Sequence, residues 1–278
     1  MSLIFGISTM IYSHENIEKL LPILTDIGVN NIEIRPNIHH FELDDSKVLD
    51  NLKKKIENHH LSVSAIHMPM KSVDISCLEE YNRVRSVREV EKTVLAAYRL
   101  DAPLIVVHPG GMCRDISKRE ERLKNSIVSL TEIAEFCNQW NVKLTIENTP
   151  PGRIGDSWIE IKKIIDELES DSVGICLDIG HHLLNNDNRE NDKISLDLEE
   201  KLGELKTRIL HIHIHDNDGK EDLHLLPGEG LLPWSSFLSF LKKINYNNTL
   251  ILELKNQTKI DIKNNKINSV FSALGENS

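Results

Sequence analysis

Residues 208–214 read RILHIHI, and within this run Ile212 and Ile214 alternate with His211 and His213. Alternation with a period of two is typical of a β-strand, because successive side chains point to opposite faces of the sheet. The run therefore predicts a strand with its isoleucines on one face and its histidines on the other.

Seven further apolar runs complete a series along the chain. The predicted strands are 3–8, 31–35, 62–68, 103–108, 142–147, 173–178, 208–214 and 249–254. Segments with helical spacing lie between them, at 16–27, 46–59, 78–100, 118–139, 157–169, 195–205, 235–244 and 258–272. Eight such alternations predict an α/β fold, a closed (β/α)8 TIM barrel that forms a single domain over residues 1–278. An open doubly wound sheet is the alternative, but its usual glycine-rich loop is missing after the first strand.

Composition narrows the classes of function. The formal net charge is −10 and the pI is near 5.7, so a broad electrostatic grip on nucleic acid is not expected. No run of about 18 apolar residues occurs, and MSLIFGISTM is predicted to be a first strand and not a signal peptide. The four cysteines form no CxxC pair, which favours reduced thiols in a cytoplasmic protein.

The strand faces that point into the barrel end on side chains that can bind metal. If Ile212 and Ile214 face the outer helices, the last inward positions of five strands are His67, His108, Glu147, Asp178 and Glu253. In the seventh strand His213 is the second-last inward position, with His215 beyond it. TIM-barrel sites lie at the carboxyl ends of the strands, so these six side chains are predicted to meet at one rim. His211 lies about 6–7 Å deeper, two strand rises below His213, and is predicted to be a buried neighbour.

Three more candidate ligands follow from spacing. His181 comes three residues after Asp178, and we expect a tight turn there in which Gly180 allows the bend. Asp222 and His224 are two residues apart in the loop after the seventh strand, where alternate residues can face one way; capping for Asp222 and surface exposure for His224 are the alternatives. His215, beyond the strand end, is expected to orient a ligand or to contact substrate. Imidazole and carboxylate ligands together suit Zn²⁺, Mn²⁺ or Fe²⁺.

Several motifs resemble those of a known superfamily. They are IHMP (66–69), VVHPGG (106–111), IENTP (146–150), CLDIGH (176–181), HIHDND (213–218), DLH (222–224), PGEG (227–230) and LELK (252–255). In order and spacing they are similar to the xylose-isomerase-like TIM barrels, which include sugar isomerases and epimerases and also endonuclease IV. The resemblance to endonuclease IV implies a zinc-binding set of His67, His108, Glu147, Asp178, His181, His213, Asp222, His224 and Glu253. The resemblance to the ketose epimerases implies one metal on Glu147, Asp178, His213 and Glu253.

The favoured hypothesis is a sugar, sugar phosphate or polyol isomerase or epimerase. The resemblance implies that Glu147 and Glu253 act as an acid/base pair and that His181 helps to bind substrate. A divalent metal, Zn²⁺ or Mn²⁺ at one to three per chain, would stabilise an enediolate. The remaining candidates for binding a carbohydrate-like substrate are His215, Arg153, Lys255 and Trp234. Trp234 and Trp158 are predicted to form an apolar wall, with ordinary packing at a helix start as the alternative.

Two alternatives come from other classes. A zinc-dependent phosphodiesterase acting on abasic DNA needs basic and aromatic residues in the loops that follow the strands. Instead, RPNIHHFELDD (35–45) ends acidic, and Met70 stands where an aromatic residue is expected. A non-catalytic sensor or partner subunit is disfavoured because every acid/base candidate is retained. Barrels of this kind often pair, which makes a homodimer one candidate arrangement, although no surface stripe in the sequence indicates it. Nucleic acid is a partner only under the endonuclease hypothesis.

Overall fold

A computed structural model describes residues 3–36, 45–185, 197–255 and 266–276, and eight parallel strands close into a barrel in it. Each strand pairs with the next, and β1 also pairs with β8. The strands are β1 (Ile4–Ser8), β2 (Asn31–Ile34), β3 (Ser62–His67), β4 (Leu104–Val107), β5 (Lys143–Glu147), β6 (Val173–Asp178), β7 (Ile209–Ile214) and β8 (Thr249–Leu252). The predicted TIM barrel is confirmed, and each predicted strand overlaps its observed counterpart.

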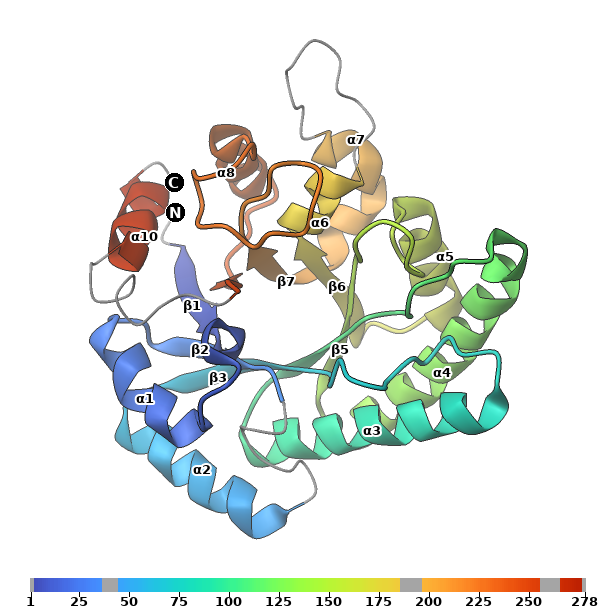
Figure 1. The fold of residues 1–278 in the computed structure, drawn as a ribbon, viewed down its shortest axis with the longest axis horizontal. Helices are drawn as coiled ribbons and strands as arrows, with labels where there is room; N and C mark the ends of the chain where they lie inside the picture. Colours follow the sequence, from blue (N-terminus) through green and yellow to red (C-terminus); the bar gives the residue numbers. More distant parts are fainter. Residues whose placement is uncertain (1–2, 37–44, 186–196, 256–265, 277–278) are drawn as a thin grey trace.

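Helices surround the barrel (Figure 1). The α-helices are α1 (Ile17–Asp26), α2 (Ser46–Asn58), α3 (Glu80–Arg99), α4 (Arg119–Gln139), α5 (Trp158–Leu168), α6 (Ile179–Leu184), α7 (Leu198–Leu202), α8 (Trp234–Lys243) and α10 (Lys266–Glu276). Short 3₁₀ helices are η1 (Thr9–Tyr12), η2 (Ile116–Lys118) and η4 (Gly203–Arg208). Residues 195–196 and 258–265 of two predicted helices lie outside the described residues. Among those described, no helix is both long and apolar enough to cross a membrane.

Helix starts follow the expected capping chemistry. Asp45 caps α2 by accepting from the backbone N–H groups of Lys47 and Val48, and Ser157 caps α5 by accepting from that of Glu160. These side chains satisfy N–H groups that have no partner within the helix. The caps fix where each helix begins, and therefore how long the preceding loop is.

The barrel has two apolar regions, a larger one outside the sheet and a smaller one inside it. The larger core lies between strands and helices and includes Ile105, Ile146 and Ile212. The smaller one contains Ala65, Leu104, Val106 and Cys176, with Leu210 packed against it. This division matches the alternation that the sequence predicted except at Leu210, which packs on the smaller region although it stands two residues before Ile212. The interior core is small because titratable side chains occupy much of the space above it.

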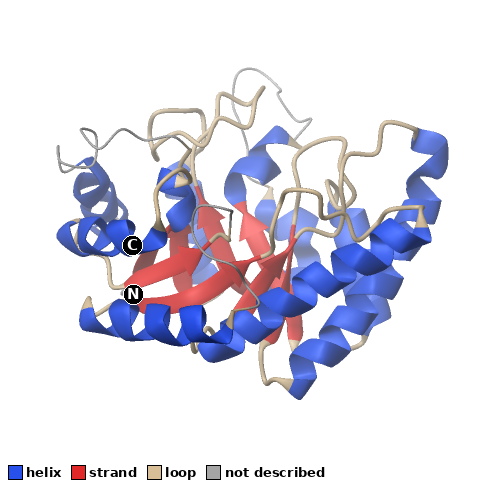
Figure 2. Ribbon diagram, turned by 60° about the horizontal axis from the view of Figure 1, so that its bottom comes forward, coloured by secondary structure: helices blue, strands red, loops and turns tan. Residues whose placement is uncertain are grey.

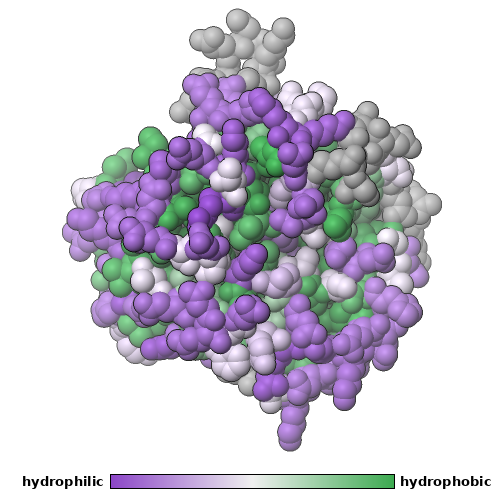
Figure 3. Space-filling view, turned by 180° about the vertical axis from the view of Figure 1, so that it is seen from behind, coloured by the Kyte–Doolittle hydropathy of each residue, from purple (hydrophilic) through white to green (hydrophobic). Residues whose placement is uncertain are grey.

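The segments that follow the strands gather at one end of the barrel, toward which the strand arrows point (Figure 2). Seen from behind Figure 1, hydrophilic residues predominate around the edge of the molecule, with smaller hydrophobic areas among them (Figure 3). The register brings the strand ends level with one another: Cys176 of β6 pairs with His211 of β7, and Asp178 pairs with His213. Side chains from neighbouring strands therefore meet at one depth.

The connection after β6 differs from the sequence expectation. The predicted tight turn at residues 178–181 is wrong, because α6 begins at Ile179 directly after the strand. Asp178 is the N-cap of α6 and accepts a hydrogen bond from the backbone N–H of His181 at 2.7 Å. Gly180 is required by close packing: a Cβ there would lie 2.1 Å from Cε1 of His215. The helix, and not a bend, presents His181 to the rim.

Candidate metal centre

Four buried side chains converge at the ends of the last four strands. We call Glu147, Asp178, His213 and Glu253 the strand group, because each stands at the end of a strand or directly after it. One ligand atom from each lies within 4.8 Å of all the others. Their exposed fractions are 0 to 1 %. Three carboxylates and an imidazole thus share one buried volume.

His213 occupies the middle of the strand group. Its Nδ1 lies 3.2 Å from Oε2 of Glu253, 3.5 Å from Oε1 of Glu147 and 3.8 Å from Oδ2 of Asp178. This buried nitrogen makes no hydrogen bond, whereas Nε2 on the other side of the ring contacts Oε2 of Glu33 at 2.8 Å. The imidazole therefore directs one nitrogen toward three carboxylates without a direct partner there.

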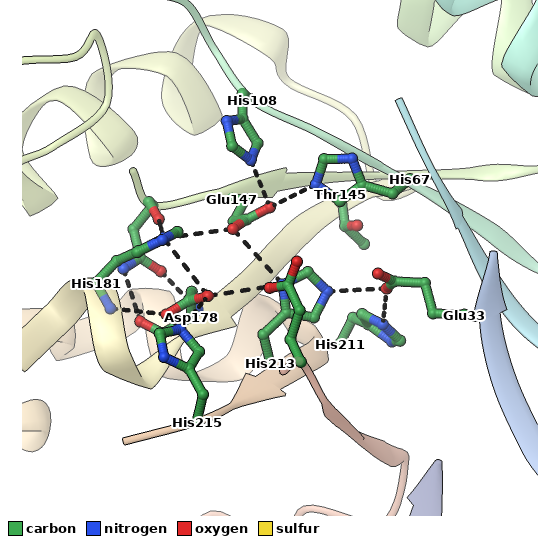
Figure 4. A network of polar contacts seen from close by, with 12 residues as sticks. Glu33, His67, His108, Thr145, Glu147, Asp178, His181, His211, His213 and His215 are labelled. Carbon is green, nitrogen blue, oxygen red and sulfur yellow. Dashed lines mark hydrogen bonds and ion pairs between the residues drawn. The ribbon is translucent and has the colours of Figure 1, made fainter. Parts of the chain in front are cut away.

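A second set, which we call the β3–β5 group, consists of His67, His108 and Glu147. Nε2 of His67 lies 3.1 Å from Oε2 of Glu147, and Nε2 of His108 lies 2.9 Å from the same oxygen. Nδ1 of His67 donates to the carbonyl of Met68 at 2.7 Å. Glu147 thus offers Oε2 to this group and Oε1 to the strand group, as Figure 4 shows.

A third set lies beyond the strand ends, and we call His181, His215, Asp222 and His224 the loop group. Nε2 of His181 lies 3.6 Å from Oδ1 of Asp222, and Nε2 of His224 lies 3.1 Å from Oδ2. The rings of His215 and His224 stack at 3.9 Å, and Nε2 of His215 lies 3.0 Å from Oδ1 of Asp178. His215, expected to orient a ligand or contact substrate, therefore stands among the candidate ligands themselves.

The orientation of the histidines fits a divalent cation. A carbonyl can only accept, so the contacts of Nδ1 in His67, His181 and His224 with main-chain carbonyls place a proton on Nδ1. In a neutral ring Nε2 then carries a lone pair, and in all three residues Nε2 faces a carboxylate. The lone pair on Nε2 and the negatively charged carboxylate oxygen repel each other unless a proton or a metal ion lies between them. Nitrogen and oxygen donors of this kind suit Zn²⁺, Mn²⁺ or Fe²⁺.

The titration of these groups reflects the same crowding. Burial raises the pKa of Glu147, but the charges of His108 and His213 outweigh it and hold the pKa well below its usual value. Burial lowers the pKa of His213, yet Cys176 and the neighbouring carboxylates raise it well above its ordinary value. Without a metal, protons therefore supply the positive charge that the carboxylates require.

His108 behaves differently from His213. Burial lowers its pKa to about 4, and the charge of Glu147 only partly opposes this. Neither ring nitrogen of His108 makes a hydrogen bond. At neutral pH His108 is thus a neutral imidazole with a lone pair available to a cation.

Two cations neutralise the outer carboxylates. Arg35 pairs through Nη1 with Oε1 of Glu253. Burial raises the pKa of Glu253, but the charges of its neighbours, Arg35 first among them, outweigh burial and hold the pKa well below its usual value. Nζ of Lys255 lies 2.8 Å from Oδ2 of Asp222. Arg35 and Glu253 are 218 positions apart in the sequence, so no local pattern indicates their pairing.

A buried aspartate shapes the loop that carries Asp222 and His224. The carboxylate of Asp216 accepts from the backbone N–H groups of residues 217, 228 and 232 and from Nε1 of Trp234, at 2.9 to 3.0 Å. Oδ1 of Asn217 accepts from the N–H groups of residues 223 and 224. His224 itself has a φ of 50°, an unusual value for a residue with a side chain. These hydrogen bonds fold the loop so that Asp222 and His224 lie beside the strand ends.

The other residues predicted to contact substrate, two tryptophans and two cations, have partners within the protein. Trp234 opens α8 and donates to Asp216, and its side chain packs against the outer core, which agrees with the packing alternative. Trp158 donates to Nδ1 of His182 in the same manner. Arg153 pairs through its backbone with Met112, and Lys255 is bound to Asp222.

Sequence reasoning missed Glu33, which lies fully buried on β2. Its Oε2 contacts Nε2 of both His211 and His213 at 2.8 Å. Burial raises the pKa of Glu33, but the His213 charge and both hydrogen bonds outweigh this and lower it to about 2. The run NIEIR carried the signal, because Glu33 alternates with Ile32 and Ile34 as the histidines of β7 alternate with their isoleucines. His211 is the buried neighbour that the sequence predicted.

Comparison with known proteins identifies the family. A family model described as "Xylose isomerase-like TIM barrel" matches residues 21–269. The chain belongs to this family. The superfamily resemblance drawn from the motifs is therefore confirmed.

Individual members of the family cover nearly the whole chain. A solved structure of a D-tagatose 3-epimerase-like protein superposes with a TM-score of 0.83 at 26 % identity, covering 99 % of both chains. An uncharacterised protein of Methanocaldococcus jannaschii is 28 % identical over 91 % of this chain and 84 % of its own length. An inosose isomerase of Bacillus velezensis is 24 % identical over 91 % of this chain and 88 % of its own. The family context is thus one of sugar epimerases and isomerases.

Proposed function

We propose that this protein is a divalent-metal-dependent isomerase or epimerase of a sugar, sugar phosphate or polyol. The observation that carries the proposal is the strand group, in which two glutamates from different strands meet around one histidine nitrogen. Glu147 and Glu253 lie 3.5 and 3.2 Å from Nδ1 of His213, and each is only 1 % exposed. A pair of carboxylates on two sides of one small volume suits removal and return of a proton.

In this proposal the strand group holds the catalytic metal. A divalent ion held there would supply positive charge that stabilises the negative charge developing when a substrate carbon next to a carbonyl loses its proton. One glutamate accepts that proton and the other returns one, to the opposite face of the same carbon in an epimerase or to the neighbouring carbon in an isomerase. Both glutamates have pKa values well below the usual range in the metal-free protein, so either can accept the substrate proton. The glutamate that returns a proton must first take one up from solvent.

Residues at the mouth position the substrate in this account. Arg35 holds Glu253 ionised, and its side chain is 16 % exposed. His181, Lys255 and Arg153 remain our candidates for contacts with hydroxyl groups. The loop group and the β3–β5 group are candidate sites for up to two further ions, within the predicted range of one to three per chain. The single domain, the homodimer and the cytoplasmic location remain predictions.

The endonuclease alternative has less support. The relatives described above include a D-tagatose 3-epimerase-like protein and an inosose isomerase, and neither name indicates a nuclease. The candidate ligands alone do not decide between the two functions, because the ligand set implied for the epimerases is contained in the larger set implied for endonuclease IV. We therefore carry the nuclease only as an arm of the test.

The test is a paired assay on protein loaded with Mn²⁺ or Zn²⁺. One arm follows deuterium uptake from solvent into ketoses, aldoses and inososes, with product analysis beside it to detect isomerisation by hydride shift. The other arm follows nicking of a duplex with an abasic site. We expect deuterium at a carbon adjacent to a carbonyl, or an isomerised product, with no nicking.

The matched variants are Glu147→Gln and Glu167→Gln, which make the same change in the strand group and at an exposed site on α5. Exchange should be lost in the first and kept in the second. Strand cleavage that disappears in Glu147→Gln, with no deuterium uptake and no isomerised product from any sugar, would show that the proposed function is wrong.

A further inference from the structure

Glu33 is a buried carboxylate directly behind the strand group. It stands on β2, is 0 % exposed, and its Oε2 lies 2.8 Å from Nε2 of His213 and 2.8 Å from Nε2 of His211 (Figure 4). Its second oxygen, Oε1, makes no hydrogen bond. A charged group this deep in a barrel is costly unless it is tightly hydrogen-bonded, so its two contacts require an explanation.

The contacts determine where the protons of His213 lie. An ionised carboxylate only accepts hydrogen bonds, so Nε2 of each histidine must carry a proton. With the proton of a neutral imidazole on Nε2, Nδ1 of His213 is the nitrogen that carries the lone pair. That atom is the one that lies 3.2 to 3.8 Å from the three carboxylates of the strand group.

Glu33, His211 and His213 also lie close enough together to be considered a metal site in their own right. Their geometry argues against that role. Both Nε2 contacts are at hydrogen-bond length and both use protonated nitrogens, so neither atom has a lone pair to give. Glu33 therefore acts on His213 from behind, and any ion would lie on the far side of the ring.

Three other inward-facing histidines are held by a weaker kind of partner. Nδ1 of His67, His181 and His224 donates to the main-chain carbonyls of residues 68, 148 and 253. These carbonyls are neutral, whereas Glu33 brings a full negative charge to His213. A carboxylate on the outer nitrogen of a histidine fixes its tautomer and raises the basicity of the inner nitrogen.

We infer that Glu33 is a positioning residue for the metal of the strand group: it holds His213 with Nδ1 toward the three carboxylates and strengthens its binding to a divalent cation. The inference rests on the proposed function in placing that ion in the strand group. It goes further by assigning the tautomer of His213 and the residue that sets it.

The first experiment measures metal affinity, independently of any reaction. Free Mn²⁺ is followed by electron paramagnetic resonance while wild type, Glu33→Gln and Glu167→Gln are titrated with the ion. Loss of such an outer carboxylate typically weakens metal binding by about 10- to 100-fold, and we expect that loss in Glu33→Gln only. Wild-type affinity in folded Glu33→Gln would overturn the inference.

The second experiment needs no variant and reads the tautomer directly. In zinc-loaded wild type with ¹⁵N-labelled histidine, we expect His213 to keep its proton on Nε2 and to bind zinc through Nδ1. The opposite arrangement, a proton on Nδ1 and zinc on Nε2, would overturn the inference. In Glu33→Gln the His213 signals should shift while those of His181 and His224 stay in place, which general structural damage would not produce.

The two proposals fail in different ways. If wild type binds Mn²⁺ and Glu33→Gln binds it more weakly, but no sugar takes up deuterium or isomerises, the function is wrong and the role of Glu33 stands. If sugars exchange deuterium in wild type and Glu33→Gln binds Mn²⁺ normally, the role of Glu33 is wrong and the function stands.

Discussion

The strand group and the loop group offer similar ligands but are positioned by different means. Every member of the strand group stands at a strand end and is almost completely buried, so the hydrogen bonds of the barrel itself determine its place. In the loop group the side chain of Asp222 is 25 % exposed, and the loop that carries it is shaped by Asp216 and Asn217. The strands of the barrel therefore position the strand group, whereas side-chain hydrogen bonds within a loop position the loop group.

The largest effect is expected in the strand group. Glu147→Gln removes a charge that serves both the strand group and the β3–β5 group, and it removes one member of the acid/base pair. General acid–base catalysis contributes about 10²- to 10⁴-fold, so deuterium exchange into the substrate should fall by about 10³-fold. The rate of exchange with Mn²⁺-loaded protein measures this. A decrease of less than about tenfold would mean that Glu147 is not the base.

The next effect tests how the loop group is built. Asp216→Asn places an NH₂ group against backbone N–H groups that now donate to a buried carboxylate, and hydrogen bonds to charged groups contribute about 1.5 to 3 kcal/mol. We expect the free energy of unfolding in urea to fall by about 2 to 3 kcal/mol. Asp218→Asn is the matched control in the same loop, and it should stay within about 0.5 kcal/mol of wild type. Equal losses in the two variants would contradict the role of Asp216.

His182 belongs to neither group, and burial is the main influence on its pKa. It accepts from Trp158, and burial lowers its pKa to about 4. His182 has a pKa near 6.5 in the unfolded chain and about 4 in the folded protein. The unfolded chain therefore binds a proton at a higher pH than the folded protein, so stability falls as the pH decreases from about 6.5 to about 4. Between pH 7 and pH 5, metal-free wild type should lose about 2 kcal/mol more than His182→Gln in urea unfolding. Parallel losses in the two proteins would show that His182 is not responsible.

The smallest effect is expected from the charge of the loop group. Asp222→Asn should reduce the number of zinc ions bound per chain, measured by mass spectrometry of the metal content, while the strand group keeps its ion. Exchange should fall by only about tenfold, the lower end for residues that support a metal site indirectly. Loss of exchange as complete as in Glu147→Gln would remove the distinction between the two groups.

Sequence reasoning predicted the strand-borne residues well, for a physical reason. Alternation along a parallel strand fixes the face of each side chain, and the barrel fixes the depth, so His67, His108, Glu147, Asp178 and His213 could be placed together before any coordinates. Glu33 obeys the same rule and was overlooked because no metal-binding motif surrounds it. Its role depends on a partner on β7, far away in the sequence.

The residues beyond the strands were harder to predict. The segment after Asp178 reads as a turn because it contains glycine, but its hydrogen bonds make it the first turn of α6. Asp216 lies in an evidently polar stretch, HDND, yet its partners are backbone N–H groups up to 16 positions away. Periodicity carries no information about such bonds, since they depend on how a loop folds back on itself.

The central claim is that the strand group holds a catalytic divalent ion. Anomalous diffraction from crystals soaked in Mn²⁺ tests it most directly, because it locates the ion without reference to any substrate. We predict a peak enclosed by Glu147, Asp178, His213 and Glu253, with Nδ1 of His213 as the nitrogen nearest to it. Manganese bound only in the loop group, or a peak beside Nε2 of His213, would contradict the account.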